Sequence, residues 1–165
     1  MARELYIIRH AKSDWGFELK DFDRPLSMRG FQDAPVMADR LHATTPGIDC
    51  LVSSPAKRAI TTAQVFAEVL HIPIKDIQIR ESIYEAGVEA LLQVVNTIDD
   101  NYTTAALFGH NPGFTMFANY LGDSNIYNIP TCGIVHLRFP DAASWSESSG
   151  NTGQTVRCIY PKDGQ

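Results

Sequence analysis

Residues 5–8, Leu-Tyr-Ile-Ile, followed at once by Arg9 and His10, form the stretch that decides how the chain folds. A short, continuous apolar run is typical of a strand that other parts of the protein cover on both faces. The run ends abruptly, so two polar side chains stand where the expected strand stops. The stretch therefore predicts a buried strand with polar chemistry at its carboxyl end.

Five further segments have the composition of strands, and helical patterns lie between the early ones. We expect the strands over residues 48–53, 77–79, 103–108, 133–139 and 155–160. Helices are expected from the N-cap Ser27 to Leu41, with the apolar face Phe31, Ala34, Met37, Ala38 and Leu41, and over 55–70, 88–98 and 114–121. Pro35 lies inside the first helical pattern, where a proline can kink the backbone. The alternation predicts an α/β fold, a three-layer sandwich with a mainly parallel central sheet flanked by helices on both faces.

The composition is that of an ordinary globular protein. The 165 residues are 44% hydrophobic and 20% charged, which excludes wholesale disorder and fits one domain over residues 1–165. With 14 basic and 19 acidic residues the net charge is −5, so we expect no binding to nucleic acid or membranes through bulk charge. Cys50, Cys132 and Cys158 are far apart and odd in number, which indicates reduced, mostly buried thiols. No signal peptide or membrane span is expected, so we predict a cytoplasmic protein.

Unusual polar residues stand at the ends of three expected strands. Arg9 and His10 follow the first strand, a serine pair leads from the second towards Arg58, and His110 follows the fourth. In open α/β sheets, ligands bind outside the carboxyl ends of the strands, so neighbouring strands would bring these side chains together. A set that is rich in cations suits a small polyanion, because an arginine fork matches phosphate oxygens and a histidine can act as nucleophile or acid.

Each of these residues has a simpler explanation when it is taken alone. A single histidine at a strand end is usually capped or solvated, and an isolated arginine after a proline turn is usually a surface charge. Their joint occurrence, at the same position of three strands, favours a common ligand.

Three motifs resemble those of the histidine phosphatase superfamily, whose fold is phosphoglycerate-mutase-like. They are Arg9-His10-Ala11-Lys12-Ser13, the segment 53–63 (SSPAKRAITTA) and Gly109-His110-Asn111-Pro112-Gly113. The first motif and the segment 24–27 (RPLS) are similar to the small bacterial phosphohistidine phosphatases of the SixA type. The resemblance extends over residues 4–137, with the motifs in the family's order.

The resemblance implies a role for each matching residue. His10 would attack phosphorus in line and become a transient phosphohistidine. Arg9, Arg58 and His110 would hold the non-bridging oxygens and offset charge in the transition state. His10 must be neutral for this attack, and we expect the two arginines to lower its pKa from the usual ~6.5. A backbone carbonyl is expected to hold the other ring nitrogen and so fix the tautomer.

The general acid stays open between two carboxylates. Larger relatives carry an acid just beyond the third strand, where Glu81 and Glu85 stand in this chain. Glu85 is our prediction, with Glu81, or no acid at all, as the alternatives. A phosphohistidine donor expels an imidazole, which leaves more easily than a sugar alkoxide, so a weak or missing acid favours phosphohistidine as the substrate.

The mouth of the pocket is expected to be open. Only one short helical pattern lies between the third and fourth strands, which leaves little chain for a lid and suits a phosphoryl group carried on a protein. The residues predicted to bind the substrate are Lys12, Ser13 and Asn111. Trp15 and Phe17 form a candidate docking patch, unless both rings fold back on the core.

The sequence contains no metal or cofactor motif, and its other three histidines are not predicted site residues. No HExxH, glycine-rich phosphate loop or paired-aspartate motif occurs, so we predict no metal and no cofactor. His136 is expected to be half-exposed in its strand, and His42 and His71 to stand at helix ends.

The leading hypothesis is a monomeric, metal-independent phosphatase that hydrolyses phosphohistidine borne by a protein. A small-metabolite phosphomonoesterase with the same histidine nucleophile is the first alternative. A phosphate-binding module without catalysis is the second.

Overall fold

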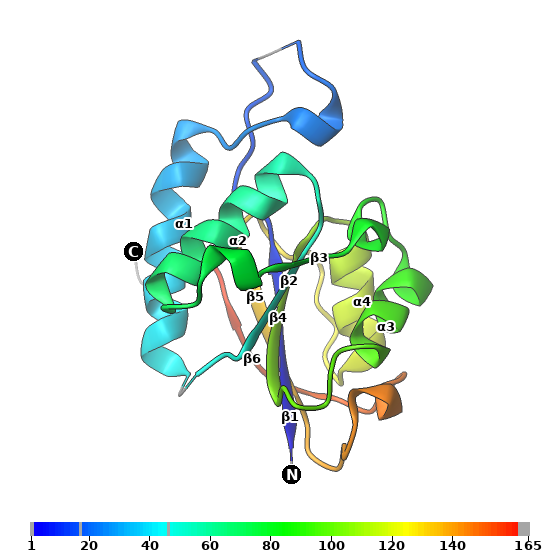
Figure 1. Ribbon diagram of the computed structural model, residues 1–165. Coiled ribbons are helices and arrows are strands. Elements are labelled where there is room, and N and C mark those ends of the chain that lie inside the picture. Colours follow the sequence, from blue (N-terminus) through cyan, green and yellow to red (C-terminus); the bar gives the residue numbers. More distant parts are fainter. Residues whose placement is uncertain (1, 17, 46, 162–165) are drawn as a thin grey trace.

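The computed structural model describes residues 2–16, 18–45 and 47–161, and within these ranges six strands form one mixed sheet (Figure 1). The strands are β1 (Arg3–Arg9), β2 (Cys50–Ser53), β3 (Gln78–Ile79), β4 (Thr104–Gly109), β5 (Ile134–Phe139) and β6 (Gln154–Ile159). Their order across the sheet is β3-β2-β4-β1-β5-β6. The first four strands run parallel to one another, and β5 is antiparallel to both β1 and β6. The mainly parallel sheet is confirmed.

Two pairs of helices cover the two faces of the sheet (Figure 1). α1 (Met28–Thr44) and α2 (Lys57–Val69) pack on one face, and α3 (Val88–Asn96) and α4 (Gly113–Leu121) pack on the other. Four short 3-10 turns lie in the connections of the described chain: η1 (Asp21–Asp23), η2 (Ile74–Asp76), η3 (Glu81–Ile83) and η4 (Trp145–Glu147). The three-layer sandwich is confirmed. Among the described residues, no helix has the length and apolar character needed to span a membrane.

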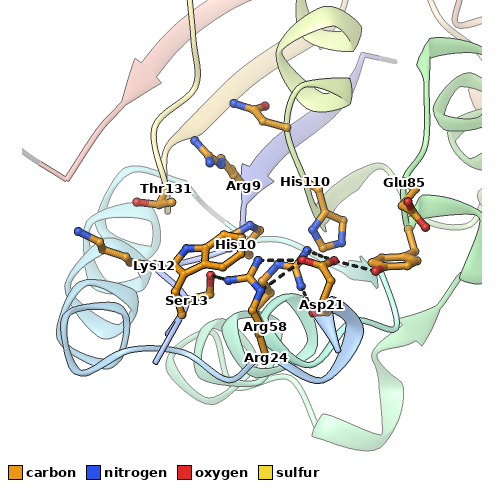
Figure 2. A pocket seen from close by; sticks show the side chains of 13 residues that line it. Arg9, His10, Lys12, Ser13, Asp21, Arg24, Arg58, Glu85, His110 and Thr131 are labelled. Carbon is orange, nitrogen blue, oxygen red and sulfur yellow. Dashed lines mark hydrogen bonds and ion pairs between the residues drawn. The ribbon is translucent and has the colours of Figure 1, made fainter. Parts of the chain in front are cut away.

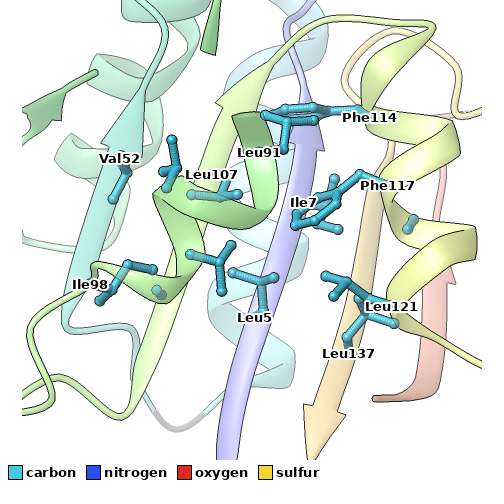
Figure 3. Packing of buried hydrophobic residues seen from close by; sticks show 14 of the residues in the cluster. Leu5, Ile7, Val52, Leu91, Ile98, Leu107, Phe114, Phe117, Leu121 and Leu137 are labelled. Atoms are coloured by element: carbon cyan, nitrogen blue, oxygen red, sulfur yellow. The ribbon is translucent and has the colours of Figure 1, made fainter. Parts of the chain in front are cut away.

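The position of β1 explains why the opening apolar run is uninterrupted. Leu5 and Ile7 enter the core beneath α3 and α4 (Figure 3), whereas Tyr6 and Ile8 enter the core beneath α1 and α2. Successive side chains of a strand point to opposite faces, so a strand that is covered on both faces needs an apolar residue at every position. β1 lies between β4 and β5 at the centre of the sheet.

Two helix details differ from the prediction. Ser27 caps α1 as expected, its Oγ accepting a hydrogen bond from the backbone N–H three residues on, and the helix continues through Pro35. Phe31 does not belong to the apolar face, because its side chain is 53% exposed. The first turn of α1 extends beyond the sheet, so a side chain there has no core to enter (Figure 1). α2 begins at Lys57 and leaves Pro55 in the turn before it.

The prediction for His136 is wrong, because its side chain is buried. Its ring stacks on Tyr6 with the centroids 4.2 Å apart, and its Nε2 lies 2.7 Å from Glu4 Oε1. β5 has a strand on either side and is covered on both faces, so it offers no half-exposed position there. His42 and His71 do lie at the ends of α1 and α2. The three cysteines are free, as expected.

Gly30 allows α1 to approach the segment that carries the predicted site. A Cβ at Gly30 would lie 2.2 Å from the carbonyl oxygen of Lys12, which already accepts a hydrogen bond from Ser27 N at 2.9 Å. We expect Gly30→Ala to push residues 10–13 away from α1, lowering the free energy of unfolding by about 1–3 kcal/mol and reducing turnover. Urea denaturation measures the first effect. Gly47→Ala is the control, because nothing lies within 4 Å of a Cβ there; an unchanged unfolding free energy for Gly30→Ala would contradict the prediction.

Candidate active site

All eight predicted site residues line one cavity of about 420 Å³ at the carboxyl ends of β1, β2 and β4 (Figure 2). They are Arg9, His10, Lys12, Ser13, Arg58, Glu85, His110 and Asn111. The cavity is also lined by Trp15, Asp21, Arg24, Tyr84 and Thr131. Glu81, the alternative acid, is not among the lining residues. The parallel pairing of β1 with β4 and of β4 with β2 brings these segments together.

His10 is held in one orientation directly after β1. Its Nδ1 lies 2.7 Å from the carbonyl oxygen of Ala11, which is the backbone anchor expected from the sequence. Because Nδ1 then donates its hydrogen, Nε2 keeps a lone pair. The Ala11 backbone N–H donates in turn to Thr62 Oγ1 at 3.0 Å, and that hydroxyl donates to the carbonyl of Arg58 at 2.8 Å. The first turns of α2 therefore support the position of the imidazole.

His110 follows β4 and faces His10 across the cavity. The two ring centroids are 5.3 Å apart, and Nε2 of His110 lies 2.8 Å from Ser54 Oγ. Ser54 stands at the end of β2, and its Oγ also accepts a hydrogen bond from Ala56 N at 3.2 Å. The serine after β2 thus fixes the ring of the second histidine.

Both histidines are neutral at ordinary pH. Burial lowers the pKa of His10 to about 3; the hydrogen bond to Ala11 opposes this shift, and the charges of His110, Arg58 and Arg9 add to it. Burial, followed by the charge of Arg58, lowers the pKa of His110 to about 4. The arginines contribute as expected, but the loss of water around each ring is the larger cause.

The lowered pKa values predict that the free energy of unfolding falls as the pH falls. The unfolded chain binds a proton on each histidine below a pH of ~6.5, whereas folded His10 does so only near a pKa of about 3, so stability falls as the pH falls through that window. Between pH 7 and pH 5, the parent should lose roughly 2 kcal/mol relative to His10→Gln. Urea denaturation of both proteins at the two pH values measures this loss. A constant difference between them would contradict the assignment.

Asp21 is a site residue that the sequence prediction missed. Arg58 donates from Nη1 to the carbonyl oxygen of Asp21 at 2.6 Å and from Nη2 to its Oδ2 at 3.0 Å. Arg24 donates to Oδ1 from Nε at 3.2 Å and from Nη2 at 3.0 Å. In the sequence, only the three-residue spacing of Asp21 and Arg24, which allows an ion pair across a helical turn, pointed to this contact. A carboxylate therefore lies among the cations of the cavity.

Arg24 connects this carboxylate to the rim predicted from the sequence. Its Nη1 donates to Ser13 Oγ, and its Cζ lies 3.4 Å from the ring centroid of Trp15. Trp15 is 76% exposed, so this ring covers an arginine at the cavity mouth and does not fold back on the core. Phe17, the other aromatic of the predicted docking patch, lies outside the described residues.

Three cavity residues carry buried nitrogens that have no hydrogen-bond partner within the described chain. The nitrogens are Arg9 Nε, Arg58 Nε and His110 Nδ1. Buried polar groups in proteins are nearly always hydrogen-bonded. Three such nitrogens around one cavity fit the binding of an anion that offers several oxygens.

Glu85 lines the cavity but is exposed, and it forms no hydrogen bond or ion pair with His10. Figure 2 shows it beyond His110, at the edge of the group of side chains. Its neighbour Tyr84 lies closer to the centre, because the Tyr84 hydroxyl donates to Asp21 Oδ2 at 2.7 Å and its ring meets His110 edge-on at 5.6 Å. The carboxylate predicted as the acid is thus peripheral to the two histidines.

Asn111 lines the cavity, but its amide is used to hold the chain. Its Nδ2 donates to the carbonyl of Ile129 at 2.9 Å and to Asn128 Oδ1 at 3.0 Å, and its Oδ1 accepts from the Thr115 hydroxyl at 2.9 Å. Arg9 Nη1 donates to the same Ile129 carbonyl at 2.9 Å. Asn111 therefore anchors the segment that also accepts from Arg9, and its role in substrate binding stays a prediction.

No group of three or more histidine, cysteine, aspartate or glutamate side chains is placed to hold a metal ion within residues 2–16, 18–45 and 47–161.

Comparison with known proteins gives a family match and a close relative. A model of the histidine phosphatase superfamily (branch 1) matches residues 5–108. An uncharacterised protein of Mycobacterium tuberculosis is 30% identical over 166 residues, which cover 94% of this chain and 100% of the relative.

Solved structures share the fold. A protein from Agrobacterium tumefaciens, assigned as the phosphohistidine phosphatase SixA, superposes with a TM-score of 0.80 at 24% identity, covering 96% of this chain and 98% of that one. A mycobacterial glucosyl-3-phosphoglycerate phosphatase gives a TM-score of 0.69 at 12% identity, covering 98% and 99%. The fold is accordingly the phosphoglycerate-mutase-like α/β fold that the sequence predicts.

Proposed function

Since the chain belongs to the histidine phosphatase superfamily, we propose that it hydrolyses phosphohistidine on a protein, with His10 as the nucleophile. The observation that carries the proposal is the neutral, oriented His10 ring facing His110 between the arginines of one cavity. This arrangement offers a lone pair to phosphorus and positive charge to the phosphoryl oxygens.

The reaction proceeds in two displacements. Nε2 of His10 forms a bond to phosphorus while the bond from phosphorus to the substrate imidazole breaks, and the released imidazole takes up a proton. Water then attacks the phosphoryl group on His10, so that the bond to Nε2 breaks and inorganic phosphate leaves. Arg9, Arg58 and His110 hold the non-bridging oxygens in both steps.

The positions of the two candidate acids, Glu85 and Glu81, support a phosphoramidate as the substrate. Glu85 is exposed at the edge of the cavity, and Glu81 does not line it. An imidazole leaves without the strong protonation that an alkoxide requires. The open cavity also favours a protein-borne phosphoryl group. The chain between β3 and β4 contains only η3 and α3, so it supplies no lid domain that could enclose a small metabolite.

A small-metabolite phosphomonoesterase is the second candidate, and two observations favour it. Glu85 does line the cavity, and a glucosyl-3-phosphoglycerate phosphatase shares the fold. If the protein is such an esterase, Glu85 must protonate the leaving alkoxide, so removing its carboxyl group must lower the rate on phosphate esters.

A substrate panel separates the two candidates. Rates on free phosphohistidine, a chemically phosphorylated protein and a series of phosphate esters are compared with a metal chelator present. We expect phosphohistidine to be preferred and Glu85→Gln to match its control Glu81→Gln. Ester preference with a loss of about 10²-fold or more in Glu85→Gln alone would establish the second candidate instead. Rapid quench in alkali should trap acid-labile phosphate on His10; if no phosphate is trapped and no compound of the panel is hydrolysed, the protein is a binding module instead.

A further inference from the structure

We propose that Asp21 is a positioning residue that fixes the guanidinium groups of Arg24 and Arg58 for phosphoryl transfer without touching the phosphoryl group. The inference rests on the proposed function only in taking this cavity as the site of that transfer.

Asp21 holds both arginines through separate atoms. Its backbone oxygen and Oδ2 accept from the two terminal nitrogens of Arg58, and its Oδ1 accepts from Nε and Nη2 of Arg24 (Figure 2). Both arginines are 5% exposed, whereas the Asp21 side chain is 48% exposed. The aspartate therefore forms the outer wall over two buried cations, and it restrains each of them at two nitrogens.

The carboxylate of Asp21 has no capacity left for a substrate. Each oxygen accepts two hydrogen bonds, because Oδ2 also receives the hydroxyl of Tyr84 at 2.7 Å. A carboxylate offers about four lone-pair sites, so all of them are used. A negative carboxylate would also repel a phosphoryl oxygen, whereas Arg58 Nε carries no partner within the described chain. Asp21 thus acts on the arginines and leaves other donors for the anion.

Removing the charge of Asp21 should separate binding from catalysis. Arg24 and Arg58 would then lose the carboxylate that pairs with them, so the attraction of the cavity for a phosphate anion would stay the same or increase. The arginines would also lose their fixed geometry, and catalysis depends on placement at the scale of 1 Å. The signature of a positioning residue is therefore slower turnover without weaker phosphate binding.

The test compares Asp21→Asn with Asp23→Asn. Asp23 lies on the same 3-10 turn and is exposed, and its carboxylate forms no hydrogen bond or ion pair with Arg24 or Arg58, which pair with Asp21. We expect Asp21→Asn to lower kcat by about 10- to 100-fold while the Kd for inorganic phosphate, measured by calorimetry, is unchanged or lower. Asp23→Asn should stay within about twofold of the parent in both quantities.

Tyr84→Phe is the second variant, because it removes one hydrogen bond from Asp21 and keeps the charge. We expect kcat to fall by about two- to tenfold, with no further fall when the change is made in Asp21→Asn, since Tyr84 would act through Asp21. Additive losses in the double variant would overturn the coupling.

Two other outcomes would overturn the proposal. An unchanged or higher kcat in Asp21→Asn would make the carboxylate a competitor of the substrate. A joint loss of kcat, phosphate affinity and unfolding free energy would make it a purely structural residue. Turnover is measured on whichever phosphorylated compound the parent hydrolyses fastest, and phosphate binding needs no turnover. The result can therefore be interpreted even if phosphohistidine proves not to be the substrate.

Discussion

His10→Ala should lower kcat by about 10⁴-fold or more while the protein stays folded. The substitution removes the nitrogen that would bond to phosphorus, and no other cavity residue of the described chain presents a neutral ring anchored in the way that Ala11 anchors His10. Steady-state turnover of phosphohistidine measures the effect, with circular dichroism as the check on folding.

The control for this variant is His42→Ala, at the far end of α1 from the cavity, which should keep the parent's rate. Hydrolysis by His10→Ala at the parent's rate would show that His10 is not the nucleophile. A variant that still releases phosphate slowly, with none trapped on the protein, would agree with residual catalysis by the remaining cations.

Arg58→Lys should lower kcat/KM by about 10²- to 10³-fold, although the charge is kept. Arg58 meets Asp21 with two nitrogens of its planar guanidinium fork, and its Nε is buried without a hydrogen-bond partner within the described chain. A lysine has a single ammonium, which cannot hold Asp21 and reach the phosphoryl group in the same geometry. Steady-state kinetics on the preferred substrate measures the loss.

Arg29→Lys is the matched control, because Arg29 is exposed on α1 and, among the residues that the structure describes, pairs only with Asp33, four residues on. That variant should be indistinguishable from the parent. If Arg58→Lys keeps more than a third of the parent's kcat/KM, the fork geometry is not what the site requires.

The sequence predicted the parts of the site that depend on strand ends. An apolar run that stops at Arg9 and His10 can be recognised locally, and parallel pairing then brings His110 and Arg58 to the same edge. The three layers of the fold could also be predicted from local patterns, since strands and helices alternate along the chain and each has a clear periodicity.

The parts that were missed depend on contacts between distant segments. Asp21 lies in a connection without periodicity, and only its contacts with Arg58 and Tyr84, 37 and 63 residues away, place it in the cavity. His136 was misjudged because its ring is buried against Tyr6 and next to Glu4 of β1, a pairing that cannot be read from β5 itself. The hydrogen bonds that Asn111 makes with Thr115 and Ile129 likewise cannot be read from the motif around His110.

Trp15, lying over Arg24 at the mouth of the cavity, gives the protein an optical reporter. The chain has two tryptophans, and the other one, Trp145, is 0% exposed in the core. Indole emission shifts to shorter wavelength when water is removed, so the two rings emit differently. Fluorescence titration with inorganic phosphate would follow the environment of Trp15 without any attached dye, while the blue component from Trp145 records whether the interior remains intact in the same cuvette.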